Sequence, residues 1–226
     1  IAHYNVCIDA YKTGEVKDSN VNINNVYLRL ANAYRKNGDY DLSIKTFNMI
    51  IQMEQSSLLL AKAWHGLGKC CMEQGKFSVA IEDFENALAY LGCNVPERPF
   101  EIMLSNTISK IKLMRCKRSS IKPGSKEFQI KEARVKILAT LAKAYFLTAN
   151  EKLYWAGITD YVQAVQLADC DASVTAIANF AAICSIKDKK DDAKKIYEST
   201  DLADRQLSVR SSAFSNFCLA LHCLNT

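Results

Sequence analysis

Cysteine and histidine have the most specific chemistry of the side chains in this sequence, which contains nine cysteines and three histidines. Clusters of thiolates and imidazoles bind zinc, and a thiol beside an imidazole can form a nucleophile and base pair. Two groupings stand out: the adjacent pair Cys70 and Cys71, and the cluster of Cys218, His222 and Cys223. Neither has the Cys-x-x-Cys spacing of zinc sites. We therefore expect no metal site, and free thiols in a reducing, cytoplasmic compartment.

Other catalytic motifs are also missing. Residues 66–69 read Gly-Leu-Gly-Lys, which lacks the spacing of a phosphate-binding loop, so these glycines are better explained by helix packing. His3, His65 and His222 each fall in an expected helix, and no Ser-His-Asp arrangement is supported. We predict no catalytic residue, no cofactor and no enzymatic activity in this chain.

Basic side chains gather between Lys110 and Lys136, where ten of them face only two carboxylates, Glu127 and Glu132. The patch begins with Lys110, Lys112, Arg115, Lys117, Arg118 and Lys122. Such a patch can dock an acidic protein surface, an anionic membrane or nucleic acid. Phe128 is the only aromatic residue in the segment, and stacking of bases requires several. We rank nucleic acid below docking or plain solubility.

The same segment contains a candidate phosphorylation site. Residues 117–121 read Lys-Arg-Ser-Ser-Ile, which is the form that basophilic kinases prefer. Phosphate on Ser120 would place negative charge beside these cations and order the loop.

The elements that carry these residues are predicted to be helical hairpins, because residues 25–92 hold two near-copies of one pattern. The first copy has Tyr27, Leu30, Ala31, Tyr34, Gly38, Tyr40, Ser43, Phe47 and Ile50. The second has Trp64, Leu67, Gly68, Cys71, Gly75, Phe77, Ala80, Phe84 and Ala87 at the same offsets. Spacings of three, four and seven place large side chains on one face of each helix, and the glycine separates the two arms. Ala31 opposite Ser43, and Gly68 opposite Ala80, should allow two antiparallel backbones to approach closely.

This pattern resembles the tetratricopeptide repeat. The resemblance implies an all-α fold, a right-handed superhelix (an α-solenoid) of antiparallel hairpins, which holds a protein or peptide partner and has no chemistry of its own. The sequence has only three prolines and eight glycines, and no uninterrupted apolar run long enough to span a membrane.

In such a stack the first helix of each hairpin lines the concave groove. The residues one or two places beyond the packing positions are Asn25, Asn32, Lys62, His65, Lys69, Lys136 and Lys143. Carboxylates are scarce among them, which favours an acidic or carboxylate-bearing peptide as partner. An ordinary solvated helix face explains the same residues. Leu28 stands where members that bind chaperone tails have lysine, so we do not expect that partner.

Five segments follow from the pattern. Residues 1–24 form an incomplete preceding repeat and a linker, with Asn22 or Asn24 as helix cap, and residues 25–92 form two hairpins. Residues 93–126 form an atypical inserted helix, opened by Pro96 and striped with Ile102, Ile108, Ile111 and Met114, and then a basic loop. Residues 127–211 form two further hairpins, with Ala156 two places beyond the expected small-residue position. Residues 212–226 form the first helix of a truncated repeat, so we interpret the chain as a piece of a longer protein.

The order of these segments resembles the helical tails of soluble adenylyl cyclases, related guanylyl cyclases and multidomain signalling kinases. The relevant residues are 89–92 (Ala-Tyr-Leu-Gly) with Pro96 after them, and 164–168 (Ala-Val-Gln-Leu-Ala). The resemblance implies a regulatory, non-catalytic segment of a signalling enzyme. The alternative is a scaffold subunit of a multiprotein assembly unrelated to cyclases, and nucleic-acid binding through residues 110–136 ranks lower.

Overall fold

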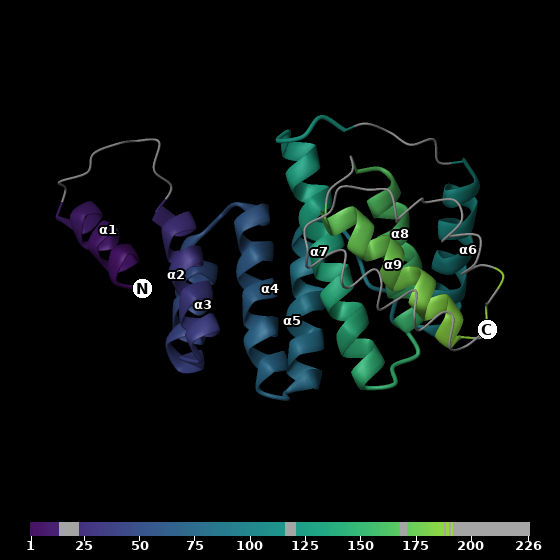
Figure 1. Ribbon diagram of the computed structural model, residues 1–226, viewed down its shortest axis with the longest axis horizontal. Helices are drawn as coiled ribbons and strands as arrows, with labels where there is room; N and C mark the ends of the chain where they lie inside the picture. Colours follow the sequence, from purple (N-terminus) through teal and green to yellow (C-terminus); the bar gives the residue numbers. More distant parts are fainter. Residues whose placement is uncertain (14–22, 116–120, 168–170, 188, 190, 192–226) are drawn as a thin grey trace. The chain divides into compact units, whose positions relative to one another are not determined.

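The computed structural model describes residues 1–13, 23–115, 121–167, 171–187, 189 and 191, and this part of the chain is helical with no strand. The helices are α1 (Ala2–Lys12), α2 (Ile23–Asn37), α3 (Tyr40–Met53), α4 (Ser57–Glu73), α5 (Phe77–Tyr90), α6 (Pro99–Arg115), α7 (Lys126–Leu147), α8 (Leu153–Val165) and α9 (Asp171–Ile186) (Figure 1). The predicted all-α fold class is confirmed. The chain divides into two compact units, residues 1–94 and 95–226.

The first unit is built from two successive hairpins (Figure 1). α2 packs against α3 and α4 packs against α5, while α3 also contacts α4, so that the second hairpin stacks on the first. Each hairpin reverses at a glycine, Gly38 or Gly75, with φ of 89° and 76°. This left-handed conformation is strained for other residues, which explains why glycine recurs at that position of the repeat.

Small residues allow the close helix packing that the sequence predicts. Ala31 and Ser43 are fully buried, and the Ser43 hydroxyl donates to the Ala31 carbonyl oxygen over 2.8 Å. Two glycines of α4 each face a buried ring, Gly66 that of Phe47 and Gly68 that of Phe84. The glycines of residues 66–69 therefore serve packing, as expected.

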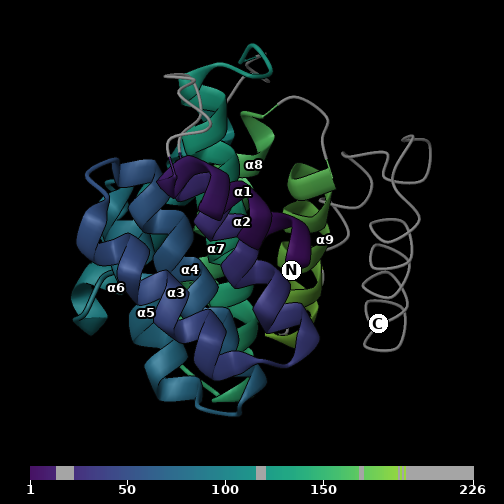
Figure 2. The ribbon, with the colours of Figure 1, turned by 90° about the vertical axis from the view of Figure 1, so that its left-hand side faces the viewer.

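The second unit places α8 at its centre. α8 contacts α6, α7 and α9, and α9 also contacts α7. Figure 2 shows α9 beside α7. The connection between α7 and α8, residues 148–152, is longer than the turns of the first unit, and this length brings Ala156 rather than Tyr154 into the fully buried small-residue position. Ser125 caps the N-terminus of α7, and its hydroxyl accepts from the Phe128 backbone N–H over 3.1 Å.

One of the two candidate caps of α2 is excluded, and the expected start of α6 is wrong. α2 includes Asn24 in its first described turn, where the Asn24 side-chain amide donates to Glu54 over 2.9 Å. α6 begins at Pro99, three residues after Pro96, so the second of the two prolines takes the first helical position. The other candidate cap, Asn22, lies outside the described residues.

The expected apolar stripe of the inserted helix is also only partly correct. In α6, Ile102 is half-buried whereas Ile108 and Ile111 point to solvent. No described helix combines the length and apolar character needed to cross a bilayer.

Candidate functional site

The predicted groove residues of the first unit lie on α2 and α4, which contact each other. Lys62, His65 and Lys69 recur at intervals of three and four along α4, and each is half-buried, so part of every side chain remains accessible. The His65 ring stands edge-on to the buried Phe84 ring, with centroids 5.6 Å apart. This contact holds the middle of the row against the core.

The two predicted groove asparagines of α2 differ from each other in their surroundings. Asn25 is exposed. Asn32 is half-buried and its side-chain amide donates to the Leu28 carbonyl oxygen over 2.8 Å, within its own helix. This bond uses one of the two N–H donors of the Asn32 side-chain amide.

The remaining predicted groove residues, Lys136 and Lys143, belong to α7 in the second unit and are exposed. Lys136 donates to Glu132 over 2.7 Å, in a pairing one helical turn apart. The structure therefore places Asn25, Asn32, Lys62, His65 and Lys69 on two contacting helices, and it places the two lysines of α7 on another unit.

An ion pair between Arg35 and Glu73 connects α2 to α4, and the sequence pattern did not reveal it. Arg35 is largely buried, with 13% of its side chain exposed, against 39% for Glu73. The two residues are offset by one place from the repeat phase, because the counterpart of Arg35 in the second copy is Met72. The pair neutralises a carboxylate near the end of the helix that carries Lys62 and Lys69.

Within the basic segment, several cations contact groups of their own unit. Lys110 lies 5.9 Å from the centroid of the Tyr154 ring. Lys131 donates to the Gln166 side chain over 2.8 Å and lies 3.3 Å from a Glu127 carboxylate oxygen. Lys112 and Lys122 are exposed. Lys117, Arg118 and Ser120, and the side chain of Arg115, lie outside the described part of the structure.

A buried carboxyl group lies behind α4. Asp83 on α5 is 7% exposed, and burial raises the pKa of its carboxyl group from 3.8 to about 6, although a hydrogen bond from the Cys71 thiol works against this rise. Burial and the neighbouring Asp83 raise the pKa of the Cys71 thiol to about 11. A thiol with so high a pKa remains protonated near neutral pH, so Cys71 is a poor nucleophile.

The second unit contains a more deeply buried carboxyl group, Asp160 on α8. It is 1% exposed, and no described residue provides a hydrogen bond to its Oδ1 atom. Burial raises the pKa of its carboxyl group well above the usual value. Asp160 follows Ala156 by four places, as Phe84 follows Ala80, so it occupies the position of the large aromatic residue of the repeat. An aspartate at this position of the repeat can be recognised in the sequence once the two-residue shift of α8 is taken into account.

The described cysteines are free thiols: Cys70, Cys71 and Cys184 are buried, Cys93 is half-buried and Cys7 is exposed. No group of three or more potential metal ligands occurs among the residues that the structure describes. Cys218, His222 and Cys223 lie outside those residues.

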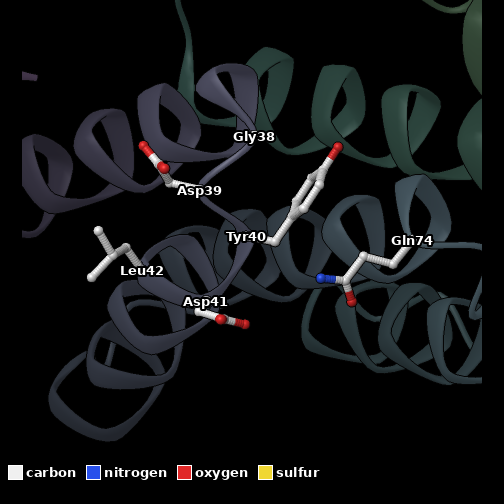
Figure 3. Close-up of a pocket in the computed structure, with 6 residues that line it drawn as sticks. All are labelled: Gly38, Asp39, Tyr40, Asp41, Leu42 and Gln74. Atoms are coloured by element: carbon white, nitrogen blue, oxygen red, sulfur yellow. The ribbon is translucent and has the colours of Figure 1, made fainter.

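An open hollow of about 390 Å³ lies at the turn between α2 and α3. Figure 3 shows Tyr40 and Gln74 on one side of it and Leu42 on the other, with Asp39 and Asp41 nearby. The Asp39 carboxylate accepts from the Asn37 side chain over 2.6 Å. The lining contains no histidine, cysteine or lysine and includes none of the predicted groove residues, so this hollow is separate from the row on α4.

Comparison with known families agrees with the hairpin architecture. Residues 22–92 match a family model described as tetratricopeptide repeat, and the matched residues cover α2 to α5. A search of curated protein sequences found no match. The family match supports a tetratricopeptide-repeat protein, and repeats of this class generally mediate protein–protein interaction.

Proposed function

We propose that the first unit binds an acidic or carboxylate-bearing peptide of another protein, and that the row Lys62, His65 and Lys69 on α4 contacts it. The observation that carries this proposal is the arrangement of the row. Its members share one face of a helix and are held half-buried, which reduces the entropy lost when they grip a ligand.

The surrounding charges favour an anionic partner. The Glu73 carboxylate at the end of α4 is paired with Arg35, so it does not compete with the ligand for the lysines of the row. Ammonium groups form charge-assisted hydrogen bonds with carboxylates and increase the rate of association with acidic partners. Asn25 and Asn32 on α2 add neutral polar groups beside the row.

The double variant Lys62→Glu and Lys69→Glu tests the proposal. Proteins captured from a lysate by the wild-type chain are identified by mass spectrometry, and their capture by the variant is then measured. We expect at least a tenfold loss of specific capture, with helicity by circular dichroism unchanged. The control carries Lys45→Glu and Lys76→Glu, which change the same charge at exposed positions on or next to other helices. Unchanged capture by the Lys62 and Lys69 variant would exclude this face.

We further propose that the chain is a regulatory, non-catalytic segment of a larger signalling protein of the cytoplasm, with a nucleotide cyclase as the leading type. The order of its segments supports this proposal, and the five described free thiols fit a reducing compartment. The alternative is a scaffold subunit of an unrelated assembly. Sequencing the flanks of the full gene separates them, because a cyclase or ATPase signature supports the first and uninterrupted repeats support the second.

Nucleic-acid binding through residues 110–136 ranks lower, since Lys110, Lys131 and Lys136 already contact groups within their own unit. These contacts partly neutralise the basic segment. We therefore rank its docking to other domains of the parent chain above the binding of nucleic acid. Strong, steeply salt-dependent binding of RNA or DNA at physiological ionic strength would reverse this ranking.

A further inference from the structure

The inserted helix α6 packs with its more polar side facing inward. It contacts α8, and the Trp155 indole N–H donates to the Ser105 hydroxyl over 3.0 Å. Ser109 is also buried, and Asn106 is half-buried with a buried amide oxygen that lacks a hydrogen-bond partner in the described structure. The side of α6 that meets its own unit thus mixes polar residues with two half-buried apolar ones, Ile102 and Leu113, of which Leu113 packs against the buried cluster around Ile158.

The opposite side of α6 is apolar and faces solvent. Its large side chains are between 42% and 66% exposed: Phe100, Met103, Leu104, Ile108 and Ile111. Their spacings of three and four place them in one continuous stripe along the helix, which is typical of a seam between two paired helices. Monomeric proteins rarely leave so continuous an apolar surface uncovered, so the stripe indicates an interface.

Charged residues beside the stripe indicate which partner fits. Glu101 and Lys112 are exposed and lie about three helical turns apart, so both border the same edge of the stripe, one near each end of α6. If a second α6 is laid antiparallel along the stripe, Glu101 of each copy lies opposite Lys112 of the other. In a parallel pair the two-fold axis runs along the seam and puts this edge of the two copies on opposite sides, so Glu101 and Lys112 would find no such partner.

We propose that α6 is a dimerisation helix, whose apolar stripe pairs antiparallel with α6 of a second copy of this chain. Such a contact is isologous, since the same patch serves both subunits and closes after two copies. The surface lies on the second unit, so the proposal goes beyond peptide binding by α4 and neither depends on the other.

Sedimentation and light scattering of the full 226-residue chain over a range of concentrations test this proposal. We expect a reversible monomer–dimer equilibrium, and at least a tenfold weaker dimer for the variant Leu104→Lys and Ile108→Lys. Both positions are already exposed, so this change should preserve helicity. The control is Val79→Lys, because Val79 on α5 is as exposed as Leu104, at 47%, and lies outside the stripe. A monomer at all concentrations, or an equally weakened dimer in the control variant, would overturn the proposal. The stripe would then have to be covered by something other than a second copy.

Charge exchange tests the antiparallel direction. Glu101→Lys gives two lysine–lysine contacts in the dimer and Lys112→Glu gives two glutamate–glutamate contacts, so each variant should dimerise several-fold more weakly. An equimolar mixture restores both opposite-charge contacts and should recover the dimer. Because Glu101 also accepts backbone N–H groups of Glu97 and Arg98, Glu101→Gln serves as the control that keeps an acceptor and avoids the repulsion. Failure of the mixture to recover, with helicity intact, would overturn the antiparallel pair.

Discussion

Gly68 on α4 lies so close to the Phe84 ring that a methyl group at Gly68 would stand 2.5 Å from Phe84 Cε1. Phe84 is completely buried, so its ring has no free space to move into. The Phe84 ring of α5 thus fills the place that a side chain at position 68 would occupy. This contact determines how closely the two helices of the second hairpin approach.

Replacing Gly68 by alanine should therefore destabilise the protein. Overpacking of a well-packed core costs about 1–3 kcal/mol, and the improved helix propensity of alanine returns roughly 1 kcal/mol. The close contact with a buried ring places the cost toward the upper end, and we expect a net loss of about 1–2 kcal/mol in the free energy of unfolding. Urea titration followed by circular dichroism measures it.

The same contact provides an internal control. In the double variant Gly68→Ala and Phe84→Leu, the smaller side chain makes room for the added methyl group. The combined loss should be smaller than the sum of the two single losses by about 1 kcal/mol. If the two losses in the free energy of unfolding simply add, the contact between position 68 and the Phe84 ring is not the reason for glycine at that position.

Asp83 should make stability depend on pH in a defined window. The folded carboxyl group has a pKa of about 6, above its ordinary value of 3.8, so the folded state binds the proton more tightly than the unfolded state. Stability is then lost as pH rises from about 4 to about 6, by up to about 3 kcal/mol in total. Asp83→Asn, which keeps an acceptor for the Cys71 thiol, should be more stable than wild type at pH 7.

The measurement is the difference in unfolding free energy between Asp83→Asn and wild type across pH 3.5 to 8. The difference should grow between about pH 4 and 6 and stay constant above this range. Asp9→Asn serves as the matched control, because Asp9 is an exposed aspartate of the same unit. An equal pH dependence in this control would contradict the assignment to Asp83.

Asp160 should show a different pH profile from Asp83. Its carboxyl group is fully buried, and its pKa is raised well above the ordinary value. The free energy of unfolding begins to fall once the carboxyl group of the unfolded state ionises near pH 4, by at most about 1.4 kcal/mol per pH unit. It stops falling only when the pH reaches the raised pKa of the folded state. Chemical denaturation of Asp160→Asn should show an advantage over wild type that grows with pH above 4. An advantage that does not change with pH would mean that the carboxyl group does not ionise differently in the folded state.

Much of the first unit can be predicted from sequence, since its information is local and repeated. Matching offsets in the two copies predict both hairpins, and Ala31 and Ser43 make the predicted close contact. The α4 row remains a prediction, because a face of polar residues looks the same in sequence whether it binds a partner or only water.

The orientation of α6 shows where sequence reasoning fails. Periodicity predicts an apolar stripe, of which Ile108 and Ile111 belong to the exposed one and Ile102 does not, and it contains no information on which neighbour covers that stripe. The usual assumption is that the apolar side faces the fold, whereas α6 turns Ser105 to Trp155 of α8, buries Ser109, and packs Leu113 against the buried cluster around Ile158. Long-range ion pairs such as Arg35 with Glu73 are missed for a similar reason, since their partners depend on how neighbouring hairpins stack.

The position of the two tryptophans gives each compact unit its own optical reporter. The sequence has two such residues: Trp64 lies half-buried in the first unit, and Trp155 lies fully buried in the second, hydrogen-bonded to α6. Replacing one of them by phenylalanine leaves the fluorescence of the other as a signal from a single unit. The loss of α6 from α8 therefore has a spectroscopic signature separate from melting of the repeats.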